Sequence, residues 1–140
     1  MIIQIIGLPG SGKTTLANVL KEKLNAIHLN ADRVREYINY DLGFSHADRI
    51  EQSKKLSGMA KLLSEQNYNI IVDFVCPTKE TRNAFGKPDL LIWVNRIKSS
   101  RFKDTDQIWE DPKEVDIIIN FGNTIDEEVE QIMNFINENV

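Results

Sequence analysis

Short apolar runs alternate along the chain with segments whose apolar residues recur at helical spacing. The apolar runs are bounded by polar residues, glycine or proline, as the buried strands of a parallel sheet usually are. We therefore predict five strands, at residues 2–6, 26–29, 69–75, 90–94 and 115–120.

Three segments show the i, i+3, i+4, i+7 spacing of an amphipathic helix. Capping boxes are predicted before the second helix, at Ser45 with Asp48, and before the third, at Thr124 with Glu127. Shorter helices are predicted at residues 32–40 and 78–85. The inward apolar positions are Leu16, Val19, Leu20 and Leu24 in the first segment, Leu56, Met59, Ala60 and Leu63 in the second, and Val129, Ile132, Met133 and Ile136 in the third.

The alternation of strands and helices predicts a single α/β domain over residues 1–140. Strands separated by helices pair in parallel, and right-handed crossovers place the helices on both faces of the sheet. The segment 95–113 is polar and has no convincing period. An irregular stretch of this length is either a lid over a site or a disordered excursion.

Composition narrows the classes of protein that fit this pattern. Apolar residues make up 41% and charged residues 27% of the chain, and the net charge of −4 argues against a sequence-independent grip on nucleic acid. Cys76 is the only cysteine, so no intrachain disulfide and no CxxC metal pair is expected, and a reducing cytoplasm is the expected location. The apolar start is short and breaks at Gly7, so neither a signal peptide nor a membrane span is expected.

The stretch "GLPGSGKT", residues 7–14, matches the phosphate-loop pattern G-x-x-x-x-G-K-[ST] at every fixed position, between a predicted strand and a predicted helix. Glycines let backbone N–H groups surround an anion, Lys13 reaches the β- and γ-phosphates of ATP, and Thr14 offers its hydroxyl to Mg²⁺. The alternative is a glycine-rich turn with a chance lysine. The residues expected to hold ATP are Gly7, Pro9, Gly10, Ser11, Gly12, Lys13, Thr14 and Thr15.

This loop, placed on five parallel strands, indicates a three-layer P-loop kinase fold with the strand order 2-3-1-4-5. The chain has no "NKxD"-like reader for guanine and is too short for most motor architectures. A polar segment before the last strand favours a small-molecule kinase, in which that segment closes over ATP and excludes water.

Two aspartates follow predicted strands, at the edge where ligands of such sheets bind. Asp32 follows the second strand and is expected to position an acceptor hydroxyl, accept its proton or hold Mg²⁺ through water, unless it only caps the next helix. Asp73 ends the third strand, as a Walker-B-type carboxylate does, or is a buried acid paired to Lys13 or Thr14. The expected magnesium-side residues are thus Thr14, Asp32 and Asp73. His28 is interpreted as a core or edge residue.

Four stretches resemble the adenylylsulfate (APS) kinase family, whose members phosphorylate the 3′-hydroxyl of adenosine 5′-phosphosulfate with ATP. They are "GLPGSGKTT", "LNADRVR" (family pattern L-D-G-D-N-x-R), "DLGFSHADRIE" (family pattern D-L-G-F-S-x-x-D-R-x-E-N) and "FVCP" (family pattern F-I-S-P). A weaker match follows at "FKDTDQIWEDP", which parallels the family's F-T-G-I-D-x-P-Y-E-x-P.

The resemblance implies roles for the residues at matching positions. Asp32 would be the base or magnesium-side carboxylate, two arginines would bind the phosphosulfate anion, and two phenylalanines would sandwich the adenine. This agrees with independent chemistry, because bases stack on aromatic rings and guanidinium forks match phosphate oxygens. The implied substrate-binding residues are Arg35, Phe44, Arg49, Gln52, Val75 and Phe102.

The chain also departs from the family pattern. Asn30 and Ala31 stand where the family has Asp-Gly, and Asp73 stands where the family more often has a small residue. Cys76 replaces the serine of F-I-S-P, and the basic lid that reads like K-G-L-Y-x-K-A-R is missing. Four residues are candidates to supply the lost charge: Arg96, Lys98, Arg101 and Lys103.

Three functions remain open at this point. The first is APS kinase, acting on a small nucleotide acceptor with ATP and Mg²⁺. The second is a related P-loop kinase acting on a polynucleotide 5′-end or a small alcohol, and the third is a nucleotide-binding module without catalysis. A homodimer is the oligomeric state that the resemblance suggests.

Overall fold

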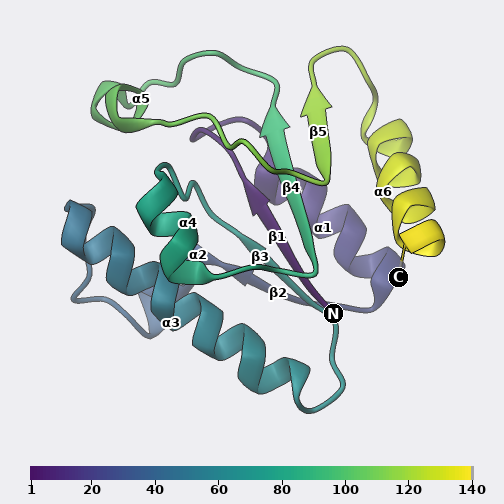
Figure 1. Cartoon of the computed structure of the whole chain (residues 1–140), viewed down its shortest axis with the longest axis horizontal. Helices are drawn as coiled ribbons and strands as arrows, with labels where there is room; N and C mark the ends of the chain where they lie inside the picture. The colour runs from purple at the N-terminus through teal and green to yellow at the C-terminus, as the bar shows by residue number, and fades with distance from the viewer. Residues whose placement is uncertain (140) are drawn as a thin grey trace.

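The computed structural model describes residues 1–139, which contain a five-stranded sheet (Figure 1). All strand pairs are parallel, and the order β2-β3-β1-β4-β5 confirms the predicted order 2-3-1-4-5. The strands are β1 (Ile2–Ile6), β2 (Ile27–Asn30), β3 (Ile70–Asp73), β4 (Leu90–Asn95) and β5 (Ile117–Asn120).

Helices cover both faces of the sheet, as the alternating pattern predicted. One apolar core joins α1 and α6 to the sheet through residues such as Leu16, Ile132 and Ile5. A second core joins α2, α3 and α4 to the other face through residues such as Leu56 and Val72. The helices are α1 (Lys13–Leu24), α2 (Ala31–Tyr37), α3 (His46–Ser64), α4 (Lys79–Phe85), α5 (Lys103–Ile108) and α6 (Ile125–Asn139).

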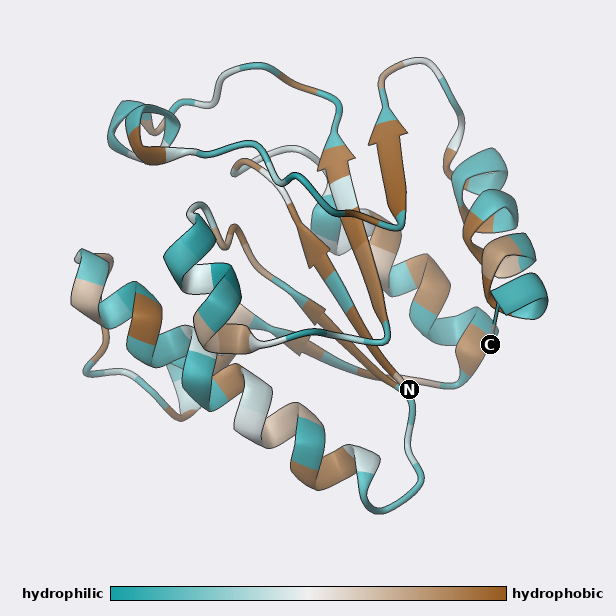
Figure 2. Cartoon of the chain, viewed as in Figure 1, coloured by the Kyte–Doolittle hydropathy of each residue, from teal (hydrophilic) through white to brown (hydrophobic). Residues whose placement is uncertain are grey.

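Apolar residues concentrate along the central strands and on the helix faces that turn toward them (Figure 2). Strand β3 is buried along its whole length, and β1 from Ile3 onward. A strand covered by helices on both faces has no solvent side, so its sequence is continuously apolar rather than alternating. This is why the apolar runs located the strands.

Local capping differs from the prediction at two helices. Helix α2 was predicted at 32–40 but spans Ala31–Tyr37. It begins at Ala31 because Asn30 is its N-cap and accepts a hydrogen bond from the backbone N–H of Arg33 at 3.0 Å, and it ends before Ile38, whose backbone is not helical. Before α3 only half of the predicted capping box forms. Ser45 accepts from the backbone N–H of Asp48 at 3.1 Å, whereas the Asp48 carboxylate accepts from Gly43.

The segment 95–113 is ordered and carries the short helix α5, so it is not the disordered excursion left open above. Ser100 folds the segment onto itself, because its backbone N–H and its hydroxyl donate to the Asp106 carboxylate at 2.8 Å and 2.7 Å. Trp109 packs near Trp93, with 6.2 Å between the ring centroids. In Figure 1 α5 extends beyond the carboxyl ends of the strands.

Over residues 1–139, no helix has the length and apolar character needed to cross a membrane.

Candidate active site

The predicted phosphate loop joins β1 to α1 at the carboxyl edge of the sheet. Gly10 (φ 77°) and Gly12 (φ 96°) adopt left-handed backbone conformations that favour glycine. Gly12 is the N-cap of α1, and no side chain within residues 1–139 caps that helix end. The first N–H groups of α1 are therefore available to an anion at the positive end of the helix dipole.

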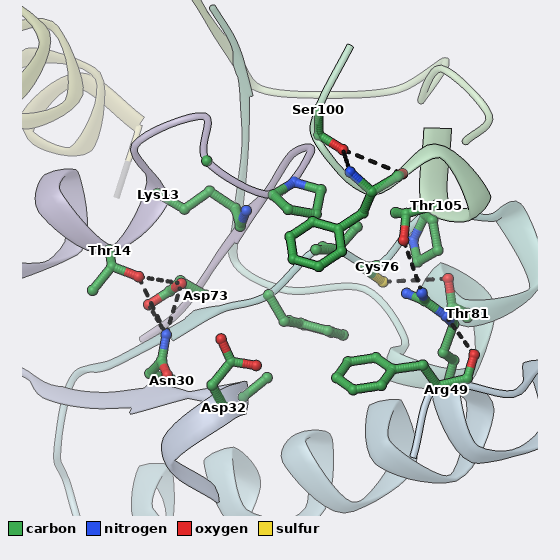
Figure 3. Close-up of a pocket in the computed structure, with 18 of the residues that line it drawn as sticks. Lys13, Thr14, Asn30, Asp32, Arg49, Asp73, Cys76, Thr81, Ser100 and Thr105 are labelled. Atoms are coloured by element: carbon green, nitrogen blue, oxygen red, sulfur yellow. Dashed lines mark hydrogen bonds between the residues drawn. The ribbon is translucent and has the colours of Figure 1, made fainter. Parts of the chain in front are cut away.

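Lys13 follows the loop and is buried, and Figure 3 shows its side chain extending into the cavity. Its ammonium group donates a 2.9 Å hydrogen bond to the carbonyl oxygen of Leu8. Burial lowers the pKa of Lys13 from 10.5 to about 8, while Asp73 and then Asp32 act in the opposite direction. The loop thus has a cation whose charge is poorly solvated and available to phosphate oxygens.

Asp73 lies at the end of β3 beside the first turn of α1, and it is 1% exposed. Its carboxylate accepts from the Thr14 hydroxyl at 3.2 Å and from the side-chain amide of Asn30 at 3.2 Å (Figure 3). It also contacts the His28 ring. A hydroxyl and a carboxylate side by side are hard oxygen ligands, and Mg²⁺ is usually held by one or two carboxylates together with phosphates and water. These residues therefore fit Mg²⁺.

Asp32 lies in the first turn of α2, and its side chain is 82% exposed. It does not cap the helix, since Asn30 does, so the alternative of a purely capping role for Asp32 is wrong. Its carboxylate lies 3.5 Å from a guanidinium nitrogen of Arg35. Asp32 therefore presents an accessible carboxylate to the cavity.

Two arginines surround the ring of Phe44. The guanidinium carbon of Arg35 lies 4.2 Å from the ring centroid and that of Arg49 lies 5.5 Å from it. Burial lowers the pKa of both arginines, but an arginine keeps its charge near neutral pH. The buried Nε of Arg35 has no hydrogen-bond partner within the described chain, and the Phe44 ring is 61% exposed. This end of the cavity combines positive charge with an open aromatic face.

Helix α5 brings the segment 95–113 to the same cavity. The guanidinium of Arg49, on α3, donates to the Thr105 hydroxyl of α5 at 3.1 Å, and Figure 3 shows this link. Phe102 is the N-cap residue of α5 and is 49% exposed. A second aromatic ring thus lines the cavity that Phe44 lines.

The cavity floor is formed largely by buried groups. Gln52 is 1% exposed; its carbonyl accepts from Asn39 at 2.7 Å and its amide donates to the Ala31 carbonyl at 3.3 Å. The backbone around Val75 precedes Cys76, a residue at φ 48°. Burial raises the pKa of the Cys76 thiol to about 11, so the group is a neutral packing element.

Most of these side chains line a single cavity of about 1430 Å³, more than the roughly 300–1,000 Å³ typical of one small-ligand pocket. Of the predicted site residues, Gly7 and Ser11 do not line it; they form the back of the loop. The predicted residues that line it are Pro9, Gly10, Gly12, Lys13, Thr14, Thr15, Asp32, Arg35, Phe44, Arg49, Gln52, Asp73, Val75 and Phe102.

His28 and Thr105 are among the contributors that were not predicted as site residues. His28, interpreted as a core or edge residue, touches the Asp73 carboxylate. Residues two apart on a strand face the same side, so its place two residues before Asn30 was the available signal. Thr105 lies in a polar segment without a period, and its contact with Arg49 had no signal in the sequence.

Comparison with known proteins agrees with this geometry. A family model described as adenylylsulphate kinase matches residues 1–88. The adenylyl-sulfate kinase of Bacillus pumilus is 30% identical over an alignment of 167 positions, gaps included. The alignment covers 98% of this chain and 85% of that protein. The bifunctional enzyme NodQ of Rhizobium sp. strain BR816 is 37% identical over 86 residues, covering 58% of this chain. The chain spans only 14% of the length of that enzyme.

Among solved structures, the fold matches the Mycobacterium tuberculosis APS kinase CysC, solved in complex with AMPPNP and APS, with a TM-score of 0.85. The two share 23% sequence identity, and the match covers 97% of this chain and 96% of the other. The neighbour confirms the P-loop kinase fold, and the match to the family model extends over more than half of the sequence. The chain belongs to the adenylylsulphate kinase family.

Proposed function

We propose that the protein transfers the γ-phosphoryl group of ATP to the 3′-hydroxyl of adenosine 5′-phosphosulfate, which yields ADP and 3′-phosphoadenosine 5′-phosphosulfate. The observation that carries the proposal is the single cavity that joins the phosphate loop to the cluster of Arg35, Arg49 and Phe44. A kinase needs a donor and an acceptor subsite that meet, and this cavity is larger than one small ligand requires.

On the donor side, the backbone N–H groups at the start of α1 and the Lys13 ammonium would bind the β- and γ-phosphates. Thr14 and Asp73 would hold Mg²⁺, with Asp32 contributing through water. The chemistry that Mg²⁺ would supply there is positive charge that offsets the negative charge developing during transfer. The low exposure of Lys13 would strengthen its attraction to the phosphates, and that of Asp73 its attraction to Mg²⁺.

On the acceptor side, the exposed rings of Phe44 and Phe102 would enclose the adenine of the acceptor. Stacking of a base on an aromatic side chain contributes about 1–3 kcal/mol. The guanidinium groups of Arg35 and Arg49 would bind the phosphosulfate, since planar forks match its oxygens.

Asp32 would act where the two subsites meet. Its carboxylate is exposed in the cavity and is not used as a helix cap. A carboxylate at this place can orient the attacking 3′-hydroxyl and accept its proton, a contribution of about 10²–10⁴-fold.

The test is ADP release with ATP and Mg²⁺, measured with adenylyl sulfate and without any acceptor. Strong stimulation by adenylyl sulfate supports the proposal, and identification of the 3′-phosphorylated product by mass completes it. The same assay with an oligonucleotide 5′-end and with small alcohols tests the related-kinase alternative. ATP binding without transfer to any of these acceptors would instead favour a binding module.

We further propose a cytoplasmic location and a homodimer. Cys76, the only cysteine, is buried as a thiol, which suits a reducing compartment. One of the structural neighbours is a hexameric APS kinase from Thiobacillus denitrificans, so assembly is a property to measure. Light scattering coupled to gel filtration would give the mass of the particle, and a monomer at assay concentrations would exclude the dimer.

A further inference from the structure

Arg96 is the first residue after β4, and it turns toward the back of the phosphate loop. Its Nη1 donates to the backbone carbonyl of Ser11 at 2.8 Å. Its Nε donates to the Glu128 carboxylate at 3.1 Å, and its Nη2 contacts the other carboxylate oxygen. One guanidinium therefore links the end of β4, the phosphate loop and α6.

Glu128 is a carboxylate with 0% exposure, and Arg96 is its ion-pair partner. A buried carboxylate is tolerated only when it is paired and hydrogen-bonded, so Glu128 fixes the guanidinium in place. With Nε and Nη2 engaged by Glu128, the orientation of Nη1 toward Ser11 is determined. The ion pair therefore leaves one guanidinium nitrogen, Nη1, free of Glu128 and directed at the phosphate loop.

The Ser11 carbonyl belongs to the same planar trans peptide as the Gly12 N–H, and in a trans peptide these two groups point in opposite directions. Holding the Ser11 carbonyl toward Arg96 therefore turns the Gly12 N–H toward the inside of the loop. An N–H at that place is one of the donors that a phosphate would use.

The space at Gly12 supports the same geometry. A Cβ atom built on Gly12 would lie 2.2 Å from Nη1 of Arg96, so any larger residue would displace the guanidinium. Arg96 thus occupies the volume directly behind the loop.

We propose that Arg96, fixed by Glu128, is a positioning residue that holds the Ser11–Gly12 peptide in its anion-binding orientation. The inference rests on the proposed function, in which this loop binds the phosphates of ATP. The guanidinium acts through the backbone and does not itself touch phosphate. It is therefore distinct from the arginines of the acceptor side, and also from Arg101 and Lys103, the candidate basic residues of segment 95–113 that line the cavity.

The test compares the affinity of the full chain for Mg²⁺–AMPPNP, by calorimetry, among wild type, Arg96→Met, Arg96→Lys and Glu128→Gln. We expect Arg96→Met to bind the triphosphate about tenfold more weakly, the effect of losing one oriented donor. Binding of adenylyl sulfate, measured in the same way, should be unchanged. Arg96→Lys, which keeps a charge but loses the fork, should bind with an affinity between those of wild type and Arg96→Met.

Asp89→Asn is the matched control. The Asp89 carboxylate accepts from the backbone N–H of Ile2 at 2.7 Å, at the start of the central strand, and Asp89 lies outside the residues that line the cavity. Its loss should lower the melting temperature and leave AMPPNP affinity at the wild-type value. This separates a general loss of stability from a loss of loop orientation.

Wild-type AMPPNP affinity in the folded Arg96→Met protein would overturn the inference. The ion pair between Arg96 and Glu128 would then only hold β4 and α6 together. If Arg96→Met does not fold, Arg96→Lys and Glu128→Gln decide, and wild-type affinity in both overturns it. If wild type itself binds no AMPPNP, the proposed function fails and the inference fails with it. Equal binding by wild type and the variants removes the inference alone.

Discussion

Replacing Phe44 with alanine should weaken acceptor binding and leave ATP binding unchanged. Phe44 is 61% exposed and lines the cavity, and the guanidinium groups of Arg35 and Arg49 lie over its ring. A stacked base loses about 1–3 kcal/mol without the ring, which corresponds to a rise of about 5- to 150-fold in the KM for adenylyl sulfate. The lost cation–π contacts are worth only about 0.5–1 kcal/mol at such an exposed site, so the fold should persist.

The assay is acceptor-dependent ADP release, with adenylyl sulfate and ATP varied in turn. Phe121→Ala is the matched control, because Phe121 is 87% exposed after β5 and lies outside the cavity lining within residues 1–139. It should leave both KM values unchanged. An equal rise in the KM for ATP and for adenylyl sulfate in Phe44→Ala would refute the assignment of this ring to the acceptor side.

Three further substitutions test the donor side and the point of transfer. Lys13→Met should abolish transfer yet raise the melting temperature near pH 7. Burial lowers the pKa of Lys13 to about 8, so folding disfavours its charged form and the substitution removes that cost; a lower melting temperature would contradict this. Between about pH 8 and pH 10.5 the unfolded chain still holds the Lys13 proton while the folded chain has lost it. The contribution of Lys13 to stability therefore increases as pH rises from about 8 to 10.5. Asp32→Asn should lower kcat about 10²–10⁴-fold with little change in the KM for ATP, and an unchanged kcat would exclude Asp32 as the base. Asp73→Asn should raise the Mg²⁺ concentration that gives half-maximal rate, because one of its oxygens is replaced by a donor; an unchanged Mg²⁺ dependence would place the metal elsewhere.

Most of the fold could be predicted from the sequence because its determinants are local. Strands buried on both faces give continuous apolar runs, and the helices beside them carry apolar stripes. The prediction was wrong where a side chain has more than one possible hydrogen-bond partner nearby. Asn30 caps α2 instead of Asp32, and Asp48 bonds to Gly43 instead of completing a capping box, choices that depend on backbone positions that the sequence does not specify.

The candidate site was predictable to the extent that it is carried by motifs. The residues of the phosphate loop are contiguous in the sequence, and so are those of the stretch around Phe44. Once the strand order is known, both stretches can be placed at the same edge of the sheet. The contacts of Arg96 and Thr105 join segments that lie far apart along the chain. Such contacts depend on how α5 and α6 pack against the ends of the strands. The residue pattern of a polar segment does not indicate this packing.

Two departures from the family pattern, at Asn30 and at Asp73, lie next to each other in the sheet and can be explained together. Asn30, where the family has an aspartate, and Asp73, where it more often has a small residue, are register partners in β2 and β3. The Asn30 amide donates to both Asp73 oxygens, at 3.2 Å and 3.3 Å, and Thr14 donates to the same carboxylate at 3.2 Å. One negative charge therefore stands one strand away from its position in the family pattern and still faces the first turn of α1. Electrostatic attraction to a cation depends on distance rather than on which strand supplies the carboxylate. We therefore propose that this exchange would preserve the negative charge available to Mg²⁺ at the proposed donor site.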